Sequence, residues 1–234
     1  VEDAAHALPT SYKGRMIGTI GDLTAYSFYV TKTLATGEGG MVVTANPDYA
    51  ERIRMMRLHG INRDVFHRTS SKLPFWYYEV VAPGFKYNMS DIAAALGIHQ
   101  LHKAETFLQR RTDIAMQYTQ ALRDLPVRTP YRHPHRTHAW HLYVLQLQLE
   151  EINIDRNTFI DKMTAAGIGT SVHFIPLHLQ PYWRDCYHFK PEDFPVALDV
   201  YQRAVSLPIY PSMSDEDVTR VITTIRTILN EAQR

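Results

Sequence analysis

The pattern of apolar and polar positions in the first half of the chain predicts short strands in some segments and helices in others. Leu23–Phe28 and Gly40–Thr44 read as short strands, and the second is rich in β-branched residues. Pro47 follows Asn46 as a helix-start signal, which predicts a helix over Asp48–Leu58. Gly60–Pro83 shows no period, and a loop of this length inside a compact domain is usually functional or mobile.

A longer helix is predicted to begin at Ser90 and Asp91. Apolar residues then recur at steps of three or four positions, or multiples of them, which defines one helix face. That face holds Ile98, Leu101, Ala104, Leu108, Ala115, Tyr118 and Leu122. A proline-rich linker follows it and contains Pro126, Pro130 and Pro134.

Beyond the linker, strand and helix patterns alternate. Trp140–Leu149 and Thr170–Ile175 read as strands. Three helices are predicted, one capped by Asp155 and ending at Gly167, and two over Pro195–Ala204 and Asp215–Glu231. This order predicts a small α/β domain over residues 126–234, which follows the end of a larger α/β domain over residues 1–125.

Composition narrows the class of protein. The 25 basic and 24 acidic side chains leave a net charge of +1, which favours neither nucleic acid nor a membrane surface as a partner. No apolar run approaches the roughly 20 residues that span a bilayer. Cys186 is the single cysteine, so no internal disulfide can form and a reducing, cytoplasmic location is expected. Because the chain starts without methionine and as if within a strand, we expect it to belong to a longer protein.

Lys32 is the most informative single residue. It follows a predicted buried strand and precedes a glycine-rich turn, Gly37-Glu38-Gly39-Gly40. An unpaired ammonium is costly to bury, so the amine must reach water, a partner or a covalent ligand. One reading is that Lys32 extends to solvent from a strand end. The other is that its amine joins a carbonyl as a Schiff base, as in pyridoxal phosphate (PLP) enzymes.

Asp3, His6 and Ser27 are further candidates near Lys32 in sequence. Asp3 ends a short strand, where ligands of open α/β sheets bind, and its carboxylate could pair with a protonated pyridine nitrogen or cap a turn at Ala4. His6 would share a helical face with Asp3 and could bond the ring hydroxyl of a cofactor or lie at the surface. Ser27 could bind a phosphate or simply end a strand.

Three other groups of residues carry weaker signals. The crowded histidines His133, His135, His138 and His141 fit no zinc spacing, so we expect no metal. The loop aromatics could stack on a ligand, although a dimer interface is favoured; they are Phe66, Phe75, Trp76, Tyr77 and Tyr78. The arginines Arg52, Arg54, Arg57, Arg63 and Arg68 are read as solvated charges.

Short motifs occur in a fixed order across essentially the whole chain. They are Glu2-Asp3-Ala4-Ala5-His6-Ala7, Tyr12-Lys13-Gly14, Ser27-Phe28, Lys32, Thr36-Gly37-Glu38-Gly39-Gly40, His59-Gly60, Gly84-Phe85-Lys86-Tyr87-Asn88-Met89-Ser90-Asp91, Trp140-His141-Leu142, Val172-His173-Phe174-Ile175-Pro176-Leu177-His178 and Leu207-Pro208-Ile209-Tyr210-Pro211. No single motif is decisive. The ordered set resembles the DegT/DnrJ/EryC1/StrS family of PLP-dependent sugar aminotransferases.

The resemblance implies a fold and residue roles. It implies the type I fold of PLP-dependent transferases, with residues 1–125 as the C-terminal part of the large mixed-sheet domain. Lys32 matches the lysine that holds PLP as a Schiff base, and Asp3 matches the partner of the pyridine nitrogen. His6 matches a ring contact and Ser27 a phosphate ligand. Asn88 matches a residue that crosses a dimer interface to the partner's cofactor phosphate.

The resemblance also implies an activity. The expected reaction converts a nucleotide-linked ketosugar to an amino sugar, with L-glutamate as amino donor, for cell-surface polysaccharide synthesis by a homodimer with shared active sites. His173 and His178 match the mouth of the active site and are candidate substrate contacts. Lys32 argues against the related dehydratases, which carry histidine there, and the motifs lean toward amination at sugar carbon 4.

Two departures from the family pattern stand out. Many members carry Asn and Arg where this chain has Lys86 and Asn88. The family segment that supplies a phosphate-binding turn and a ring-stacking aromatic precedes the part matched here. This second departure motivates an alternative function, a catalytically silent dimerisation or regulatory module that keeps the aminotransferase fold.

Overall fold

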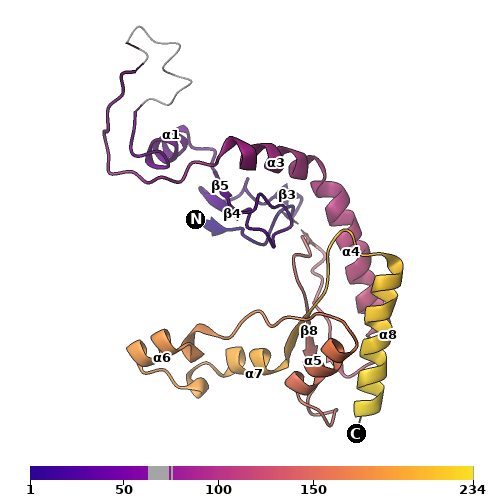
Figure 1. Ribbon diagram of the computed structural model, residues 1–234. Coiled ribbons are helices and arrows are strands. Elements are labelled where there is room, and N and C mark those ends of the chain that lie inside the picture. The colour runs from indigo at the N-terminus through magenta and orange to yellow at the C-terminus, as the bar shows by residue number, and fades with distance from the viewer. Residues whose placement is uncertain (63–73, 75, 234) are drawn as a thin grey trace. The chain divides into compact units, whose positions relative to one another are not determined.

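The structure is a computed structural model that describes residues 1–62, 74 and 76–233 (Figure 1). The chain forms two compact units. The first unit comprises Val1–Glu105 and His135–Ala139, and the second comprises Thr106–Pro134 and Trp140–Arg234.

The main sheet of the first unit is three-stranded, in the order β1-β4-β5. It is built from β1 (Glu2–Asp3), β4 (Thr24–Ser27) and β5 (Gly40–Val43). β1 runs parallel to β4, whereas β5 runs antiparallel to it. The strands predicted at Leu23–Phe28 and Gly40–Thr44 are therefore confirmed. The carboxyl ends of β1 and β4 and the amino end of β5 meet at one edge.

A second, smaller sheet in the same unit has the order β3-β2-β7. Its strands are β2 (Ser11–Tyr12), β3 (Arg15–Met16) and β7 (Arg136–Thr137), and both pairings are antiparallel. The sequence gives no sign of this sheet because two-residue strands are too short for a period to show. β7 also lies just beyond the proline-rich stretch that was expected to be a linker.

Two helices of the first unit bury none of their residues. They are α1 (Pro47–Met56), capped by Asn46, and α3 (Asp91–His102), capped by Ser90. Both starts agree with the predictions. On α3 the apolar side chain of Ile92 is 78% exposed. This face of the first unit thus carries unburied apolar surface.

The long helix expected from Ser90 to Leu122 is in fact two helices. α3 ends at Lys103, whose backbone N–H bonds to the carbonyls of Gln100 and Leu101, and α4 covers Ala104–Ala121. The predicted face is buried in α4, where Tyr118 is fully buried, and is not buried in α3, where Ile98 and Leu101 are each 57% exposed.

The division between the two units also differs from the boundary expected at residues 125 and 126. It falls within α4, because Ile114, Ala115 and Leu122 pack into the core of the second unit.

The sheet of the second unit is antiparallel, in the order β6-β8-β9. Its strands are β6 (Val127–Arg128), β8 (Tyr143–Leu147) and β9 (Ala204–Leu207). β8 alternates buried and half-buried positions, which confirms the strand predicted within Trp140–Leu149. The strand predicted at Thr170–Ile175 is wrong. Only Ser171 pairs there, with Ser206, and the chain then leaves the sheet toward Pro176, which lacks an N–H to donate.

The helices predicted for the second unit are confirmed. They are α5 (Arg156–Ala165), α7 (Pro195–Arg203) and α8 (Asp215–Ala232). Asp155 caps α5 by accepting a hydrogen bond from the backbone N–H of Thr158 over 2.7 Å. The sequence missed α6 (Pro181–Tyr187) and the short 3-10 turns η1 (Leu177–Leu179) and η2 (Pro191–Asp193).

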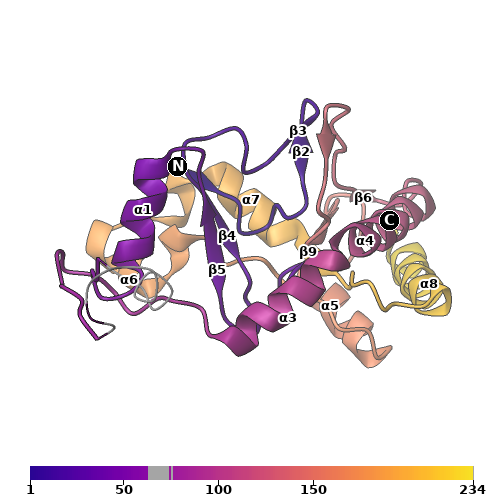
Figure 2. The same cartoon turned by 90° about the horizontal axis from the view of Figure 1, so that it is seen from above.

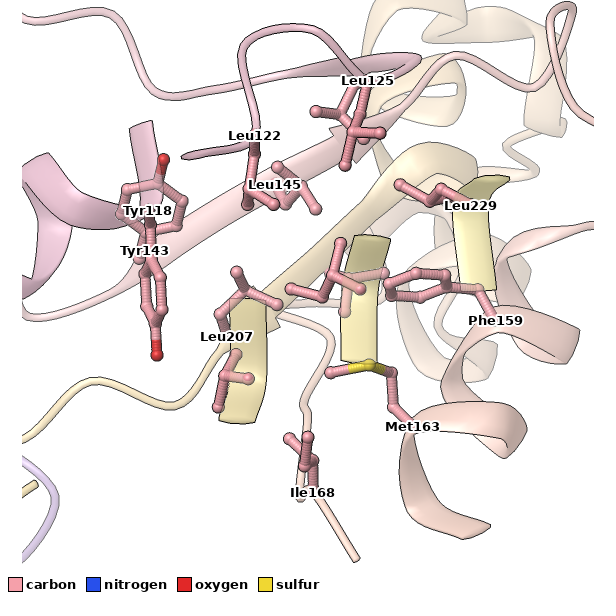
Figure 3. Packing of buried hydrophobic residues seen from close by; sticks show 14 of the residues in the cluster. Tyr118, Leu122, Leu125, Tyr143, Leu145, Phe159, Met163, Ile168, Leu207 and Leu229 are labelled. Atoms are coloured by element: carbon pink, nitrogen blue, oxygen red, sulfur yellow. The ribbon is translucent and has the colours of Figure 1, made fainter. Parts of the chain in front are cut away.

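A continuous hydrophobic core holds the second unit together (Figure 3). Phe159 from α5 and Leu229 from α8 are fully buried in it. Tyr118 and Tyr143 pack edge to face with ring centroids 5.2 Å apart, and burial raises the pKa of Tyr143 to about 12. Each phenol has a partner, since Tyr118 donates to the carbonyl of Pro208 and Tyr143 bonds Thr119. Among the described residues, no helix has the length and apolarity that crossing a bilayer would require.

Candidate active site

The candidate site lies at the edge of the β1-β4-β5 sheet where the parallel strands β1 and β4 end. The parallel register pairs Asp3 with Ala25, and the N–H of Ala4 donates to the carbonyl of Ala25 over 2.8 Å. Ser27 ends β4 two positions after Ala25. Asp3 and Ser27 are therefore brought to one edge, as parallel pairing of their strands requires. Figure 2 shows β4 and its antiparallel neighbour β5 side by side in this sheet.

Asp3 has one carboxylate oxygen occupied and one available. Its Oδ1 accepts a hydrogen bond from the N–H of Ala5 over 3.0 Å, so the turn-capping reading holds for that oxygen. Its Oδ2 has no hydrogen bond among the described residues. Asp3 is exposed and lines a cavity of about 510 Å³ in the first unit. A carboxylate held by the backbone on one side and open on the other can still pair with a ligand cation.

Lys32 lies in a loop over residues 28–39. The backbone of Phe28, where the loop begins, makes two hydrogen bonds to residues near its end. The N–H of Phe28 donates to the carbonyl of Gly39 over 2.8 Å, and its carbonyl accepts from the N–H of Thr36 over 2.9 Å. Phe28 and Thr36 are buried under this closure. Gly39 has a φ of 154°, and a Cβ there would come within 2.6 Å of the Thr36 hydroxyl oxygen, so the turn requires glycine.

A side-chain contact fixes this loop beside the segment that follows Asp3. The hydroxyl of Thr33, the neighbour of Lys32, donates to the carbonyl of Leu8. Lys32 is half-buried, and its backbone N–H donates to Tyr29 over 2.9 Å. Its ammonium makes no hydrogen bond or ion pair with any residue that the structure describes. A half-buried amine in this state is available to a ligand.

Ser27 and Asn88 lie beside this loop with partners of their own. The Ser27 hydroxyl accepts a hydrogen bond from the N–H of Tyr29 over 3.3 Å. Asn88 is exposed and accepts from the ammonium of Lys86. Its neighbour Met89 reaches the loop, since the methionine Cε would be 3.0 Å from a Cβ on Gly39.

His6 does not share a helical face with Asp3. Residues 4–7 form a turn, closed by a 2.9 Å hydrogen bond from the N–H of Ala7 to the carbonyl of Ala4, and no helix follows. The expected helical relation was wrong because Pro9 and the strand β2 take the chain away before a helix can start. His6 is exposed on this turn.

Tyr26 braces the sheet on the side of Glu2. Its phenol donates to the carbonyl of Ile17, which holds the segment after β3 against β4. Burial, and secondarily the Glu2 carboxylate, raise the pKa of Tyr26, so the phenol remains a donor. Glu2 is itself engaged, since it accepts a 2.6 Å hydrogen bond from the hydroxyl of Thr24.

The two histidines considered as substrate contacts belong to the second unit. His173 is half-buried, shares a 2.8 Å hydrogen bond with the hydroxyl of Ser206, and lines an apolar hollow of about 710 Å³ together with Phe174 and Phe194. His178 is buried against Phe194 with ring centroids 4.7 Å apart. Its Nε2 has no hydrogen-bond partner among the described residues.

Several other predicted residues lie away from this edge. Trp76 and Tyr78 are exposed, and Tyr77 is half-buried with its phenol on Glu79 over 2.8 Å. The predicted aromatics Phe66 and Phe75 and the arginines Arg63 and Arg68 lie outside the described residues. The solvated-charge reading is confirmed for the α1 arginines Arg52 and Arg54 and for Arg57, which are all exposed.

Sequence reasoning missed one element beside Asp3. Arg136, from β7, lines the same cavity as Asp3, and its guanidinium lies over the ring of Tyr12. No role was predicted for Tyr12, although it belongs to the motif Tyr12-Lys13-Gly14. The one signal for Arg136 in the sequence is the absence of acidic residues near it, which leaves its charge unpaired by close neighbours.

Comparison with known proteins identifies the family. A family model described as the DegT/DnrJ/EryC1/StrS aminotransferase family matches residues 1–226. An uncharacterized protein of Methanocaldococcus jannaschii is 51% identical over 232 residues, which cover 99% of this chain and 60% of that protein. The spore coat polysaccharide biosynthesis protein SpsC of Bacillus subtilis is 49% identical over 234 residues, which cover 99% of this chain and 60% of SpsC.

Solved structures agree on the fold. Spr1654 of Streptococcus pneumoniae, described as a sugar aminotransferase, has structures in PMP and PLP forms. Its PMP form is 31% identical with a TM-score of 0.88 and covers 98% of this chain and 58% of that one. The expected α/β fold class is thereby confirmed, and the chain spans about 60% of the length of its curated relatives. The chain belongs to the DegT/DnrJ/EryC1/StrS aminotransferase family.

Proposed function

We propose that the intact protein is a PLP-dependent aminotransferase that converts a nucleotide-linked ketosugar to an amino sugar, with L-glutamate as the donor. The family supports amino transfer, and the name of SpsC supports a role in cell-surface polysaccharide synthesis. The observation that carries the proposal is the placement of Lys32. Thr33 ties its loop to the segment after Asp3, and its amine has no partner among the described residues.

The residues at this edge fit PLP by their chemistry. Lys32 supplies a primary amine, which is what an aldehyde needs to form a covalent link. Asp3 lines a cavity and supplies a carboxylate with one oxygen that has no hydrogen bond among the described residues, which is what a protonated ring nitrogen needs. Ser27 supplies a hydroxyl at the end of β4 for the phosphate, and His6 an imidazole for the ring. We propose these four side chains as the cofactor contacts of this chain.

Their roles follow from the charges that they carry. When bound, PLP would supply an aldehyde carbon that carries the amino group from the donor to the ketosugar and a ring that accepts electrons during the transfer. The Asp3 carboxylate would hold the proton on the ring nitrogen and so keep the ring cationic. The Lys32 amine would hold the cofactor at rest and, once displaced, would move a proton at the reacting carbon of the substrate.

The assembly is part of the proposal. We propose a cytoplasmic homodimer in which Asn88 of one subunit reaches the cofactor phosphate of the other, consistent with its exposure. His173 and His178 are proposed as contacts of the sugar substrate. The hollow of about 710 Å³ that His173 lines supports a ligand contact for that residue.

Absorbance spectroscopy of the intact protein tests the proposal. We expect PLP addition to give the visible band of a protein-bound Schiff base, and L-glutamate to bleach that band as the amino group is transferred. Lys32→Ala should abolish both, whereas Lys103→Ala, which removes an exposed amine at the end of α3, should leave both intact. A dimer of the wild-type protein that takes up no PLP would instead establish a silent dimerisation module.

A further inference from the structure

The β3-β2-β7 sheet places two arginines and a tyrosine in one row. Tyr12 on the central strand is directly opposite Arg15 on β3 and Arg136 on β7. Directly opposed residues of antiparallel strands project from the same face of a sheet. The row Arg15–Tyr12–Arg136 therefore crosses one face, and the partners of Ser11 occupy the other.

The cations in and beside this row are not neutralised. The guanidinium of Arg136 lies 5.5 Å from the ring centroid of Tyr12, and the ammonium of Lys13 lies 5.3 Å from it. Arg15 donates to the carbonyl of Thr19. Within the part of the chain that the structure describes, none of these three cations forms an ion pair. All three are exposed.

The sequence around the row is free of acid. Residues 4–21 and 135–139, which contain this sheet, hold no Asp or Glu, although the chain has 24. Two of the three cations lie over the ring of Tyr12, and none has a carboxylate in its own segment. Like charges repel one another, and a bound anion would relieve that repulsion.

The row adjoins the cavity of about 510 Å³ that contains Asp3. Arg136 and Tyr12 line one part of it, and Glu2 and Asp3 line another. Glu2 is engaged by Thr24, and Asp3 holds Ala5 with one oxygen. The lining of the cavity thus contains one cation, Arg136, and two acidic residues, Glu2 and Asp3.

A hydrogen-bonded brace fixes the position of β7. The N–H of Ser11 donates to the Thr137 hydroxyl over 2.7 Å, and the two hydroxyls bond over 2.8 Å. The N–H of Lys13 donates to the carbonyl of His135 over 2.8 Å. Arg136 is therefore presented by a held strand rather than by a loose loop, which reduces the ordering cost of binding.

We propose that Arg136, Arg15 and Lys13, arranged around Tyr12, bind the diphosphate of the nucleotide-linked substrate and direct its sugar toward Asp3. The proposal rests on the proposed function for its substrate class. Guanidinium groups match phosphate oxygens with paired donors, and Lys13 adds a point charge. A compact group of three cations at the edge of a cavity that Arg136 lines suits a small dianion better than a nucleic acid, which needs a longer basic track.

Calorimetric titration with inorganic pyrophosphate tests this site in the intact protein loaded with PLP, so that the cofactor's own phosphate site is filled. We expect wild-type protein to bind pyrophosphate and Arg136→Gln to bind it about tenfold or more weakly, the loss typical of one charge-assisted contact. Arg136→Lys should bind more tightly than Arg136→Gln and more weakly than wild type, because it keeps the charge and loses the paired donors. Arg54→Gln, which removes an exposed charge from α1 in the same unit, should bind like wild type.

Failure of this inference can be told from failure of the proposed function. The PLP band of the wild-type protein and its bleaching by L-glutamate need no diphosphate, so they test the proposed function separately from pyrophosphate binding. Wild-type protein that shows no PLP band refutes the proposed function itself. A normal PLP band with no pyrophosphate binding, or with equal binding by wild type and Arg136→Gln, overturns the diphosphate site alone.

Discussion

The two compact units reach their geometry by different means. The second unit is organised around a large apolar core to which α4, α5, α8 and all three strands contribute. The first unit buries few side chains, and neither α1 nor α3 buries any. What positions Lys32 and Asp3 is instead a set of backbone hydrogen bonds around Phe28 and Ala4 and one hydroxyl contact from Thr33.

This difference separates stability from function along the chain. Core substitutions in the second unit should lower the free energy of unfolding, whereas substitutions at the site should lower activity and leave unfolding almost unchanged. The predictions below test that separation, beginning with the largest expected effect.

Phe159→Ala should destabilise the protein by about 3–5 kcal/mol, because a fully buried aromatic ring is replaced by a cavity in the core. Urea unfolding followed by circular dichroism measures the change. Ile92→Ala on α3 is the matched control, since its side chain is 78% exposed, and it should change the free energy by no more than about 0.5 kcal/mol. Equal effects of the two substitutions would remove the contrast between the units.

Asp3→Asn should reduce amino transfer by about a hundredfold or more, because the amide cannot hold the ring proton by charge. The amide oxygen can still accept from Ala5, so the turn and the unfolding free energy should persist. Steady-state kinetics and urea unfolding are measured together. Asp22→Asn, at an exposed position of the same unit, is the control. Activity of Asp3→Asn close to wild type would contradict the assigned role.

Asp155→Ala should cost about 1 kcal/mol of stability, because the N–H of Thr158 loses its capping acceptor at the start of α5. The loss should appear in urea unfolding with no change in the PLP spectrum. Asp161→Ala, within the same helix and exposed, controls for removing a carboxylate. A change in the PLP spectrum would show that the two units are not separable in this way.

Among the substitutions meant to alter stability, Asp124→Asn should change the free energy of unfolding least, and the change should depend on pH. Arg226 donates to both carboxylate oxygens, over 2.7 and 2.8 Å, and lowers the pKa of Asp124 from 3.8 to about 2. Because the folded-state pKa is depressed, this stabilisation is complete above pH 4 and is lost as the pH falls toward 2. The stability difference between wild type and Asp124→Asn should shrink over that range, and a constant difference would contradict the assignment.

Local signals explain which parts of the fold the sequence could predict. The caps at Asp155 and Ser90 and the alternation in β8 act through neighbouring residues, so the elements that they define were predicted. The strand expected at Thr170–Ile175 does not form, although its sequence favours one. Among these residues only Ser171 pairs with a neighbouring strand, and a sequence pattern does not show whether a pairing partner is present. The break at Lys103 was missed because an apolar period continues across it.

The candidate site divides in the same way. Asp3, Ser27 and Lys32 could be found because they lie within 30 residues of one another and match ordered motifs. Arg136 could not, because its place beside Tyr12 depends on a strand pairing between distant parts of the chain. Neither β2 nor β7 is long enough to show a periodic pattern from which that pairing could be predicted.

The most direct test of the account is chemical trapping at Lys32. The intact protein is supplied with PLP, treated with borohydride and digested, and the peptides are analysed by mass spectrometry. We predict a pyridoxyl phosphate adduct on the peptide that contains Lys32, and its absence after Lys32→Ala. An unmodified Lys32 peptide, or an adduct on another lysine at wild-type level, would contradict the account.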